Sequence, residues 1–231
     1  MLIEDYLDGK EASVMAIVAG SSDGENVFPL ALSQDYKRLL DKDEGPNTGG
    51  MGAISPTPVI GEERLNEIVE LVYKPVIQEL QKRGITYKGF LYAGLMVHSD
   101  GSFKVIEFNC RLGDPETEVL LPRMESDLLE VLNLATTAEL QADQMKWSKE
   151  ACVGVVLASK GYPLKSEDKK PVSGISDSGL VTIFQCGNYI EEDSLHTKGG
   201  RVFVVTAKAE SVDKARAVSY THLTLPTILL V

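Results

Sequence analysis

The stretch KVIEFNCRLGDPETEVLLP, residues 104–122, decides how this chain is interpreted. It belongs to a predicted strand over 103–110 and breaks at Gly113-Asp114-Pro115. Because side chains alternate along a strand, Val105, Glu107, Asn109 and Arg111 are expected to share one face. The other face is expected to belong to a core and carries Ile106, Phe108 and Cys110. The polar set should therefore face a cavity or solvent.

The polar set has the chemistry of a cation and phosphate site. A carboxylate and an amide carbonyl two residues apart offer the hard oxygen ligands that Mg²⁺ prefers. Arg111 can neutralise phosphate or carboxylate charge. Asp114 followed by Pro115 is typical of a helix N-cap and first helical residue, which would aim backbone N–H groups at the same site. The alternative is an exposed strand end whose glutamate and arginine make ordinary hydrogen bonds and bind no ligand.

A second stretch, SQDYKRLLDKDEGPNTGGMGAISP at residues 33–56, is rich in glycine. We expect residues 33–58 to be long and irregular, and such a segment in a compact domain is usually functional or disordered. Its glycines allow close approach of the backbone to a ligand. Without Walker spacing the pattern alone does not establish phosphate binding, and a mobile surface loop is the alternative.

A third stretch, LIEDYLDGKEAS at residues 2–13, predicts a strand, an exposed crossing segment and a turn. Glu4 and Glu11 could accept hydrogen bonds from an amine and a sugar hydroxyl. The plain edge of a hairpin is the alternative.

Hydrophobic periodicity predicts the remaining elements of the first part. Strands over 12–20 and 27–32 form one antiparallel hairpin around a turn at 21–26, and strands over 89–98 and 103–110 form another. A helix is expected over 62–83, kinked at Pro75 and ended by Gly84. A second helix is expected over about 124–140, and its predicted buried side consists of Leu128, Leu129, Leu132 and Ala135.

The polar segment 141–150 is the candidate domain boundary. Strands over 151–159, 180–186 and 201–207 then predict a small β-rich domain at 148–218, after a first domain at 1–142. The pattern predicts a helix that begins at 211–217. The tail at 219–231 is rich in Thr and Leu and continues neither that helix nor a strand. A native terminus and a sequence of foreign origin are both open for this tail.

The composition is that of an ordinary globular protein with a formal net charge of −11. No block of Lys or Arg interrupts this acidity, so we expect no nucleic-acid partner. No apolar run approaches the ~20 residues of a membrane-spanning helix, so no membrane partner is expected either. The three dispersed cysteines predict buried small side chains in a reducing, cytoplasmic protein.

The three stretches, in this order and spacing, resemble the glycinamide ribonucleotide synthetase (phosphoribosylamine–glycine ligase) family of the ATP-grasp superfamily. The resemblance runs from about Leu2 to Ala217. The motifs that carry it are Glu4–Gly9, Ser33–Arg38, Gly45–Ala53, Gly89–Gly94, Glu107–Glu116, Ala158–Pro163 and Gly199–Val202.

The resemblance implies an α+β fold, with the second half of an ATP-grasp domain (an antiparallel sheet with helices) followed by a small β-rich C-terminal domain. It implies ATP-dependent ligation of glycine to 5-phosphoribosylamine in purine synthesis. Glycine's carboxylate would take the γ-phosphoryl group of ATP to give glycyl phosphate, and the amine would then displace phosphate.

The resemblance also implies roles for particular residues. The ligands of Mg²⁺ (or Mn²⁺) would be Glu107 and Asn109. The ATP contacts would be Glu4, Asp5, Tyr6, Leu7 and Glu11. The substrate and phosphate contacts would be Asp35, Lys37, Arg38, Asn47, Thr48, Gly49, Gly50, Met51, Gly52 and Glu116. Arg111 and Asp114 would be the catalytic residues in the same cleft.

The sequence also departs from the family pattern. The strand that contains Gly94-Leu95-Met96 supplies no additional acidic metal ligand. The family's substrate domain and the first half of its ATP-grasp domain would precede Met1, so we expect the chain to be a fragment that is inactive without that half. The alternatives are another ATP-grasp carboxylate–amine ligase and a non-catalytic nucleotide-binding module.

Overall fold

The computed structural model describes residues 6–20, 26–175 and 179–224. They form two compact units, and each is described by itself. The first unit consists of Met1–Gln34, Pro56–Gly113 and Met124–Trp147, and the second of Asp35–Ser55, Asp114–Arg123 and Ser148–Val231. The predicted domains, 1–142 and 148–218, are continuous stretches of sequence, whereas each compact unit combines several separate segments. The predicted limits therefore stay a prediction.

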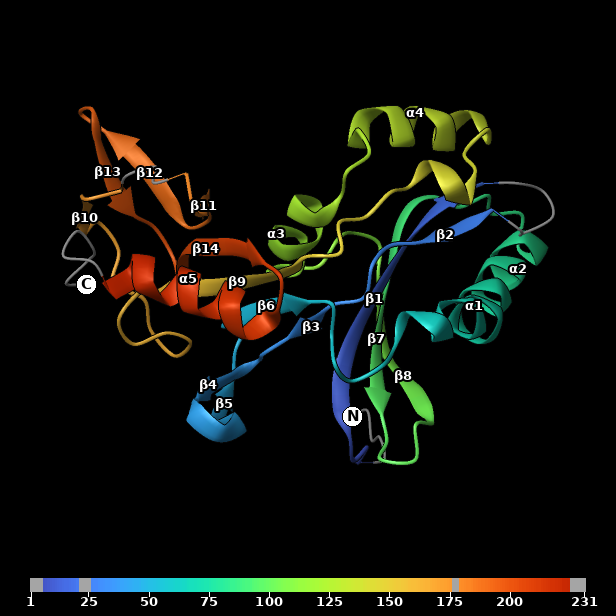
Figure 1. The fold of residues 1–231 in the computed structure, drawn as a ribbon, viewed down its shortest axis with the longest axis horizontal. Coiled ribbons are helices and arrows are strands. Elements are labelled where there is room, and N and C mark those ends of the chain that lie inside the picture. The colour runs from blue at the N-terminus through green and yellow to red at the C-terminus, as the bar shows by residue number, and fades with distance from the viewer. Residues whose placement is uncertain (1–5, 21–25, 176–178, 225–231) are drawn as a thin grey trace. The chain divides into compact units, whose positions relative to one another are not determined.

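The first unit is built on a four-stranded antiparallel sheet with the order β2-β1-β7-β8 (Figure 1). Its strands are β1 (Lys10–Ala19), β2 (Val27–Pro29), β7 (Lys88–Val97) and β8 (Phe103–Asn109). Both predicted hairpins are confirmed, although residues 21–25 of the first turn lie outside the described residues. The strands form because β-branched and aliphatic residues fill them and Gly or Asp separates them.

One helical segment, interrupted by a wider turn, covers this sheet. It consists of η2 (Glu62–Arg64), α1 (Leu65–Ile68), the π-turn η3 (Val69–Tyr73) and α2 (Lys74–Lys82). Pro75 lies in the first turn of α2, just after the π-turn, where its missing N–H leaves no internal gap in the helix. Gly84 has a φ of +74° and ends the segment as predicted.

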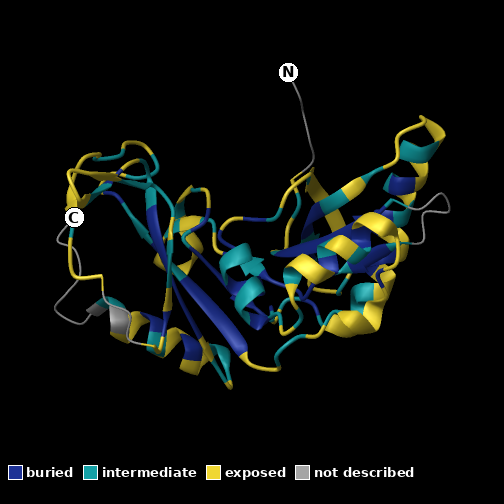
Figure 2. Ribbon diagram, turned by 90° about the horizontal axis from the view of Figure 1, so that it is seen from above, coloured by how far each residue is buried: buried dark blue, intermediate teal, exposed yellow. Residues whose placement is uncertain are grey.

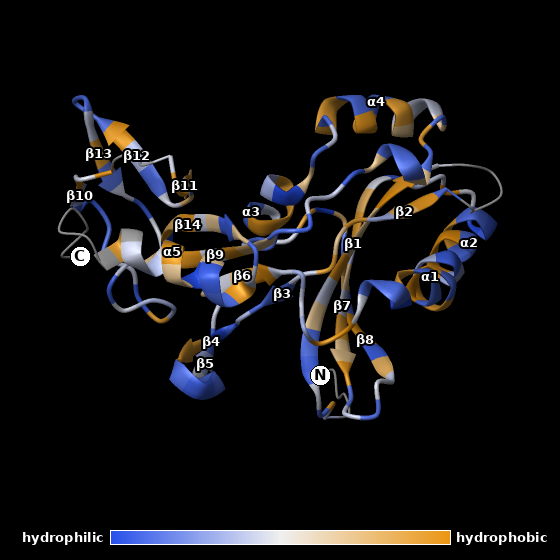
Figure 3. Cartoon of the chain, in the orientation of Figure 1, coloured by the Kyte–Doolittle hydropathy of each residue, from blue (hydrophilic) through white to orange (hydrophobic). Residues whose placement is uncertain are grey.

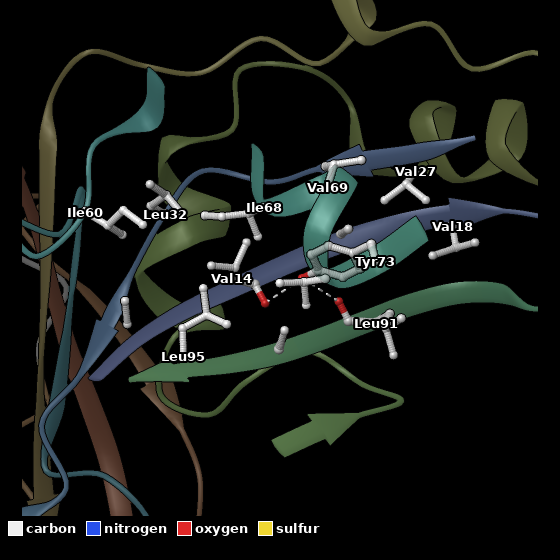
Figure 4. Packing of buried hydrophobic residues seen from close by; sticks show 14 of the residues in the cluster. Val14, Val18, Val27, Leu32, Ile60, Ile68, Val69, Tyr73, Leu91 and Leu95 are labelled. Carbon is white, nitrogen blue, oxygen red and sulfur yellow. Dashed lines mark hydrogen bonds between the residues drawn. The ribbon is translucent and has the colours of Figure 1, made fainter. Parts of the chain in front are cut away.

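The core of the first unit lies between this helical segment and the sheet (Figure 4). Val14 on β1 and Leu95 on β7 pack there against Ile68, Val72 and Tyr73 of the helical segment. The Tyr73 hydroxyl donates to the carbonyl oxygens of Val14, at 2.9 Å, and Leu91, at 3.4 Å. The buried Tyr73 hydroxyl is therefore hydrogen-bonded, whereas a buried hydroxyl without a partner would lower stability.

Helix α4 (Leu128–Thr137) also contacts β1 and β7, and the 3-10 turn η5 (Ala142–Gln144) follows it. The prediction of its buried side is partly wrong: Leu129 is 69% exposed, whereas Val131 and Ala135 are buried. The helix begins at Leu128 and not near 124, and its buried residues are Val131 and Ala135. Hydrophilic and hydrophobic sides are visible on both α2 and α4 (Figure 3).

The second unit contains a five-stranded antiparallel sheet with the order β11-β14-β9-β6-β3. Its strands are β3 (Gln34–Asp35), β6 (Gly52–Ser55), β9 (Ala151–Ala158), β11 (Thr182–Gln185) and β14 (Arg201–Ala209). Helix α5 (Val212–Thr224) packs Ala215 on Ile54 and Val153. The short helix α3 (Thr117–Leu120) packs Val119 on Ala53 and Cys152 of the opposite face. Buried residues line the strands of this sheet (Figure 2).

The expectation of an irregular segment at 33–58 is wrong. Besides β3 and β6 it contains the hairpin of β4 (Arg38–Leu40) and β5 (Glu44–Asn47), joined by η1 (Asp41–Asp43). Another small sheet, β10-β13-β12, is made of β10 (Pro171–Val172), β12 (Asn188–Glu191) and β13 (Ser194–Thr197), and the 3-10 turn η4 (Leu121–Arg123) follows α3. The α+β fold class with antiparallel sheets is confirmed.

Three further expectations meet the structure here. The helix α5 continues through 219–224, so the expectation that it stops before the tail is wrong, and residues 225–231 lie outside the described residues. Cys110 is exposed and not buried as predicted, whereas Cys152 is buried and Cys186 half-buried. Burial raises the pKa of Cys152 to about 12 and that of Cys186 to about 11. Within the described ranges, no helix combines the length and the apolarity that crossing a membrane requires.

Candidate functional site

The pairing of β8 with β7 contains a bulge that decides where its polar residues lie. Val105 lies opposite Leu95 and Glu107 opposite Gly94, so Ile106 is an extra residue on β8. Residues directly opposite in an antiparallel pair share a face. Val105 therefore lies on the helix-covered face, with Leu95, whereas Glu107 lies on the other face.

The predicted alternation along β8 is therefore only half right. Glu107 and Asn109 share a face as predicted, because Asn109 lies opposite Tyr92 in the same ladder. Val105 does not share it. The assignment of the apolar set to a core is wrong, since Ile106 is 39% and Phe108 40% exposed and Cys110 is exposed. The reason is that β8 is an edge strand of the sheet.

The Glu107 and Asn109 side chains touch each other. The Asn109 Nδ2 group donates to Glu107 Oε1 at 3.2 Å. Glycine at position 94 leaves room for the acid, because a Cβ there would lie 3.3 Å from Glu107 Cγ. A carboxylate and an amide side by side at the surface fit a hard divalent cation that keeps water or phosphate ligands. Among the described residues there is no cluster of three or more His, Cys, Asp or Glu side chains suited to a metal ion.

The same face carries a predicted nucleotide contact. Glu11 on β1 lies opposite Met96, which lies opposite Lys104 on β8. In the next row Gly94 lies between Ser13 on β1 and Glu107 on β8, so all three share this face. We call this surface the Glu107 face; its members are Glu11, Ser13, Met15, Tyr92, Gly94, Met96, Lys104, Glu107 and Asn109.

Interior polar contacts fix the middle of the Glu107 face. The hydroxyl oxygens of Ser13 and Tyr92 are 3.1 Å apart, and both side chains are buried. Of the predicted ATP contacts before β1, Tyr6 is 90% exposed and Leu7 is half-buried, and Glu4 and Asp5 lie outside the described residues. Their roles stay predictions.

Arg111, a predicted catalytic residue, follows β8 in the first unit. Its side chain is exposed, and its Nη1 group donates to the Leu112 carbonyl at 2.9 Å. It thus keeps a free part of the guanidinium at the surface.

The predicted substrate residues Asp35, Lys37, Arg38 and Asn47–Gly52 belong to the second unit. Several backbone N–H groups of this segment donate within the chain. The Thr48 N–H donates to Lys37 O and the Met51 N–H to Tyr36 O. The Gly50 N–H donates to Thr48 Oγ1 at 3.0 Å. A phosphate could reach these N–H groups only by replacing the bonds, so side chains are the better candidates for ligand contacts in this loop.

The glycines of this loop serve close packing. Gly50 has a φ of +115°, and a Cβ there would lie 2.5 Å from Pro115 Cδ and 2.6 Å from Asp35 Oδ1. Asp35 is buried, whereas the side chains of Arg38 and Asn47 are exposed on the facing strands β4 and β5. The Arg38 Nη1 group donates to Gly45 O at 2.8 Å.

An arginine and a tyrosine to which the sequence assigned no role hold this loop at Gly49. The Arg201 Nη1 group donates to Gly49 O at 2.7 Å and to Asp114 O at 2.8 Å, and Nη2 lies 3.0 Å from Asp114 Oδ2. The Gly49 N–H donates to the Tyr162 hydroxyl at 2.8 Å. We call these four residues, Gly49, Asp114, Tyr162 and Arg201, the Arg201 clasp.

Asp114 does not cap a helix, contrary to the prediction. Helix α3 begins at Thr117, its N-cap position is Glu116, and no side chain caps it. Pro115 lies in the turn before it, so the predicted anion site at this helix start is wrong. The Asp114 carboxylate is instead paired with Arg201.

Two further acids lie close by in the sequence. Glu116 is 3% exposed. Burial raises the pKa of Glu118, and the Asp114 and Glu116 carboxylates add to this effect while Arg201 opposes it. The sequence analysis missed Glu118, Tyr162 and Arg201; the motifs Gly161-Tyr162-Pro163 and Gly199-Gly200-Arg201 marked the positions of the last two but not their contacts.

Comparisons with known proteins agree with these elements. The ATP-grasp (A) domain of phosphoribosylglycinamide synthetase matches residues 1–117, and the C domain of the same enzyme matches residues 152–228. A phosphoribosylamine–glycine ligase of Vibrio parahaemolyticus is 45% identical over 222 residues, which are 95% of this chain and 51% of that protein. The chain spans about half the length of the curated relatives it matches.

Solved structures give the same picture. The crystal structure of the phosphoribosylamine–glycine ligase of Thermotoga maritima matches with a TM-score of 0.82 at 35% identity, covering 94% of this chain and 53% of that one. The biotin carboxylase domain of a thermophilic 2-oxoglutarate carboxylase matches with a TM-score of 0.70 at 12% identity, covering 96% and 48%, which shows a shared fold alone. The chain belongs to the phosphoribosylglycinamide synthetase family.

Proposed function

We propose that this chain supplies the metal strand and part of the substrate site of an ATP-dependent ligase that joins glycine to 5-phosphoribosylamine in purine synthesis. The products are glycinamide ribonucleotide, ADP and phosphate. The observation that carries the proposal is the pair Glu107 and Asn109 on one face of β8, in a chain of this family. Three free cysteines support a reducing location such as the cytoplasm.

The proposed reaction has two steps, and each forms one bond and breaks another. Oxygen of the glycine carboxylate attacks the γ-phosphorus of ATP, the bond to the bridging oxygen breaks, and ADP leaves. The amine of phosphoribosylamine then attacks the carbonyl carbon of glycyl phosphate, loses a proton and expels phosphate. Both steps demand charge neutralisation at phosphoryl oxygens and fixed alignment of the reacting groups.

Residues of the first unit would serve the first step. Glu107 and Asn109 would hold Mg²⁺ or Mn²⁺, which neutralises phosphate charge when it is bound. Glu11 would accept a hydrogen bond from the ribose, and the segment from Glu4 to Leu7 would contact the adenine. Arg111 would neutralise negative charge on the acyl phosphate.

Residues of the second unit serve the substrates. Side chains are better placed for this than backbone N–H groups, because the latter are bonded within the loop. The contacts would come from Asp35, Lys37, Arg38, Asn47 and Thr48, with Asp114 and Glu116 as acids for an amine. Gly49, Gly50, Met51 and Gly52 would shape the loop.

The test uses the chain coexpressed with the part of the Vibrio parahaemolyticus relative that it does not span. Glycine-dependent ADP release should require phosphoribosylamine. Glu107→Gln should lower kcat at least ~100-fold, because it removes a charged metal ligand. The matched control is Glu79→Gln on α2, an exposed glutamate that pairs with Lys82 and Arg83, and it should retain full turnover.

Distinct outcomes separate the alternatives. ADP release with another acid or amine, but not with glycine and phosphoribosylamine, would indicate a different carboxylate–amine ligase. Binding of ATP without release under any substrate would indicate a non-catalytic module. Unchanged turnover in Glu107→Gln would remove Glu107 from the metal role.

A further inference from the structure

The Arg201 clasp joins segments that are far apart in the sequence. Arg201 begins β14, Tyr162 follows β9, Gly49 lies in the loop before β6, and Asp114 precedes α3. One guanidinium reaches two carbonyl oxygens and one carboxylate oxygen at 2.7 to 3.0 Å. The C=O and the N–H of Gly49 are both taken by clasp side chains. The two peptide groups on either side of the Gly49 Cα are therefore both held by clasp side chains.

The clasp is built for close contact. A Cβ at Gly49 would lie 3.0 Å from the Tyr162 hydroxyl and 3.3 Å from Arg201 Cζ, and a Cβ at Gly200 would lie 2.2 Å from the Tyr162 ring. Glycine at both positions allows the tyrosine and the arginine to reach the loop.

The base of the clasp is fixed by its own hydrogen bonds. The Ser159 hydroxyl donates to Gly199 O at 2.7 Å, and the Ser159 N–H donates to Gly200 O at 2.7 Å. The Tyr162 N–H donates to Ser159 O at 3.1 Å. Since Tyr162 and Arg201 both emerge from this bonded corner between β9 and β14, their side chains reach the loop from a common support.

We propose that Arg201, with Tyr162, is a positioning residue that holds the loop 48–51 and Asp114 in register for substrate binding. The inference rests on the proposed function, because the loop and Asp114 are substrate residues only there. Arg201 acts through its neighbours: both Nη groups contact Gly49 or Asp114, and its side chain is only 20% exposed. Lysine could not replace it fully, since an ammonium lacks the planar fork that reaches three acceptors.

The first measurement is amide hydrogen exchange in the 231-residue chain itself. Tyr162→Phe removes the acceptor of the Gly49 N–H, and Arg201→Met removes the donors to Gly49 O. Each should accelerate exchange at Gly49 at least about 10-fold, with β9 and β14 amides unchanged. The matched control Arg83→Met replaces the exposed arginine that directly follows α2 and should leave Gly49 exchange unchanged.

The second measurement is steady-state kinetics of the coexpressed enzyme described above. Arg201→Lys and Tyr162→Phe should raise KM for glycine or phosphoribosylamine about 10-fold, with KM for ATP unchanged and Arg201→Lys milder than Arg201→Met. If Arg201→Met fails to fold, Arg201→Lys and Tyr162→Phe still carry the test.

The outcomes are distinguishable. Unchanged Gly49 exchange in both variants would overturn the clasp. Faster exchange with unchanged KM values would make the clasp structural and overturn the positioning role. Absence of glycine-dependent ADP release in the unsubstituted enzyme would overturn the proposed function and with it the kinetic role, while the exchange result would still report on the clasp.

Discussion

Glu118 is a carboxyl group whose surroundings favour its protonated form. Its Oε2 atom is buried and, within the described part of the chain, has no hydrogen-bond partner. Burial raises its pKa, the Asp114 carboxylate adds to the rise, and Arg201 counteracts it. The folded chain therefore binds a proton more readily than the unfolded chain does in the interval between the ordinary and the raised pKa. Stability contributed by Glu118 is present below that interval and is lost as the pH rises through it.

We therefore predict that Glu118→Gln stabilises the chain at pH 8 relative to the unsubstituted protein, and that the difference vanishes toward pH 4. Urea denaturation across that pH range measures it. Glu125→Gln, at an exposed glutamate, is the control and should give no such trend. A Glu118→Gln advantage that is equal at both ends of the range would contradict the account.

Tyr73 tests the core of the first unit at a single hydroxyl. The side chain is fully buried, and its hydroxyl donates to Val14 O at 2.9 Å. Tyr73→Phe keeps the ring and should lower the free energy of unfolding by about 1 kcal/mol, because the carbonyl loses a buried donor. Tyr6→Phe, at a tyrosine that is 90% exposed, should change it by less than about 0.5 kcal/mol. Equal effects in urea denaturation would argue against the hydrogen bond.

Single residues differ in how well their positions and contacts can be predicted from the sequence. The spacing of Glu107 and Asn109 was enough to place both on one face, since local alternation decides it. Arg201 and Tyr162 were missed as contacts, because their partners Gly49 and Asp114 lie at distant positions in the chain. Only the tertiary fold creates that proximity.

Helix α4 shows what local signals can establish at the scale of an element. Asp127 is its N-cap, and its side chain accepts from the Glu130 N–H at 3.0 Å. The sequence predicted the helix but extended its start to about 124, because apolar periodicity locates a helix better than its ends.

We predict that Asp127→Ala destabilises the chain by about 1 kcal/mol, whereas Asp127→Asn, which keeps the acceptor, loses much less. Urea denaturation gives the total effect, and amide exchange at Val131 and Leu132 shows that it arises in α4. An asparagine variant as unstable as the alanine variant would rule out the cap as the cause.

The strands β3 to β6 were not readable in the same way. Segments of two to four residues, such as Arg38–Leu40, are too short to show a period. They form because pairing with other strands satisfies their backbone groups; Gly52 on β6, for example, lies opposite Val155 on β9. Glycine content was the visible signal, and it indicated close approach to a ligand, or alternatively a mobile loop, where the structure has close packing within the chain.

At the scale of the whole molecule, the acidity of the chain limits what it can attract. A formal net charge of −11 repels an anionic nucleotide at long range, so the proposed nucleotide binding would depend on local groups such as a cation held by the Glu107 face. The chain also spans about half the length of its curated relatives.

We predict that the 231-residue chain alone releases no glycine-dependent ADP, and that coexpression with the part of the relative it does not span restores release. A coupled ADP assay with phosphoribosylamine measures both. The control omits glycine, since release without glycine would be plain ATP hydrolysis. Glycine-dependent release by the chain alone would show that these residues suffice for the site.

The bulge at Ile106 adds one residue to β8, while the pairing with β7 continues in order on both sides of it. Deleting Ile106 would leave Val105 opposite Leu95 and Glu107 opposite Gly94, so Val105, Glu107 and Asn109 would each keep their present face of the sheet. Deleting Phe108 instead would shift the phase after Glu107 and turn Asn109 toward the helix-covered side. The strand should therefore tolerate the loss of Ile106 but not the loss of Phe108, because only the second deletion would separate Glu107 and Asn109 onto opposite faces.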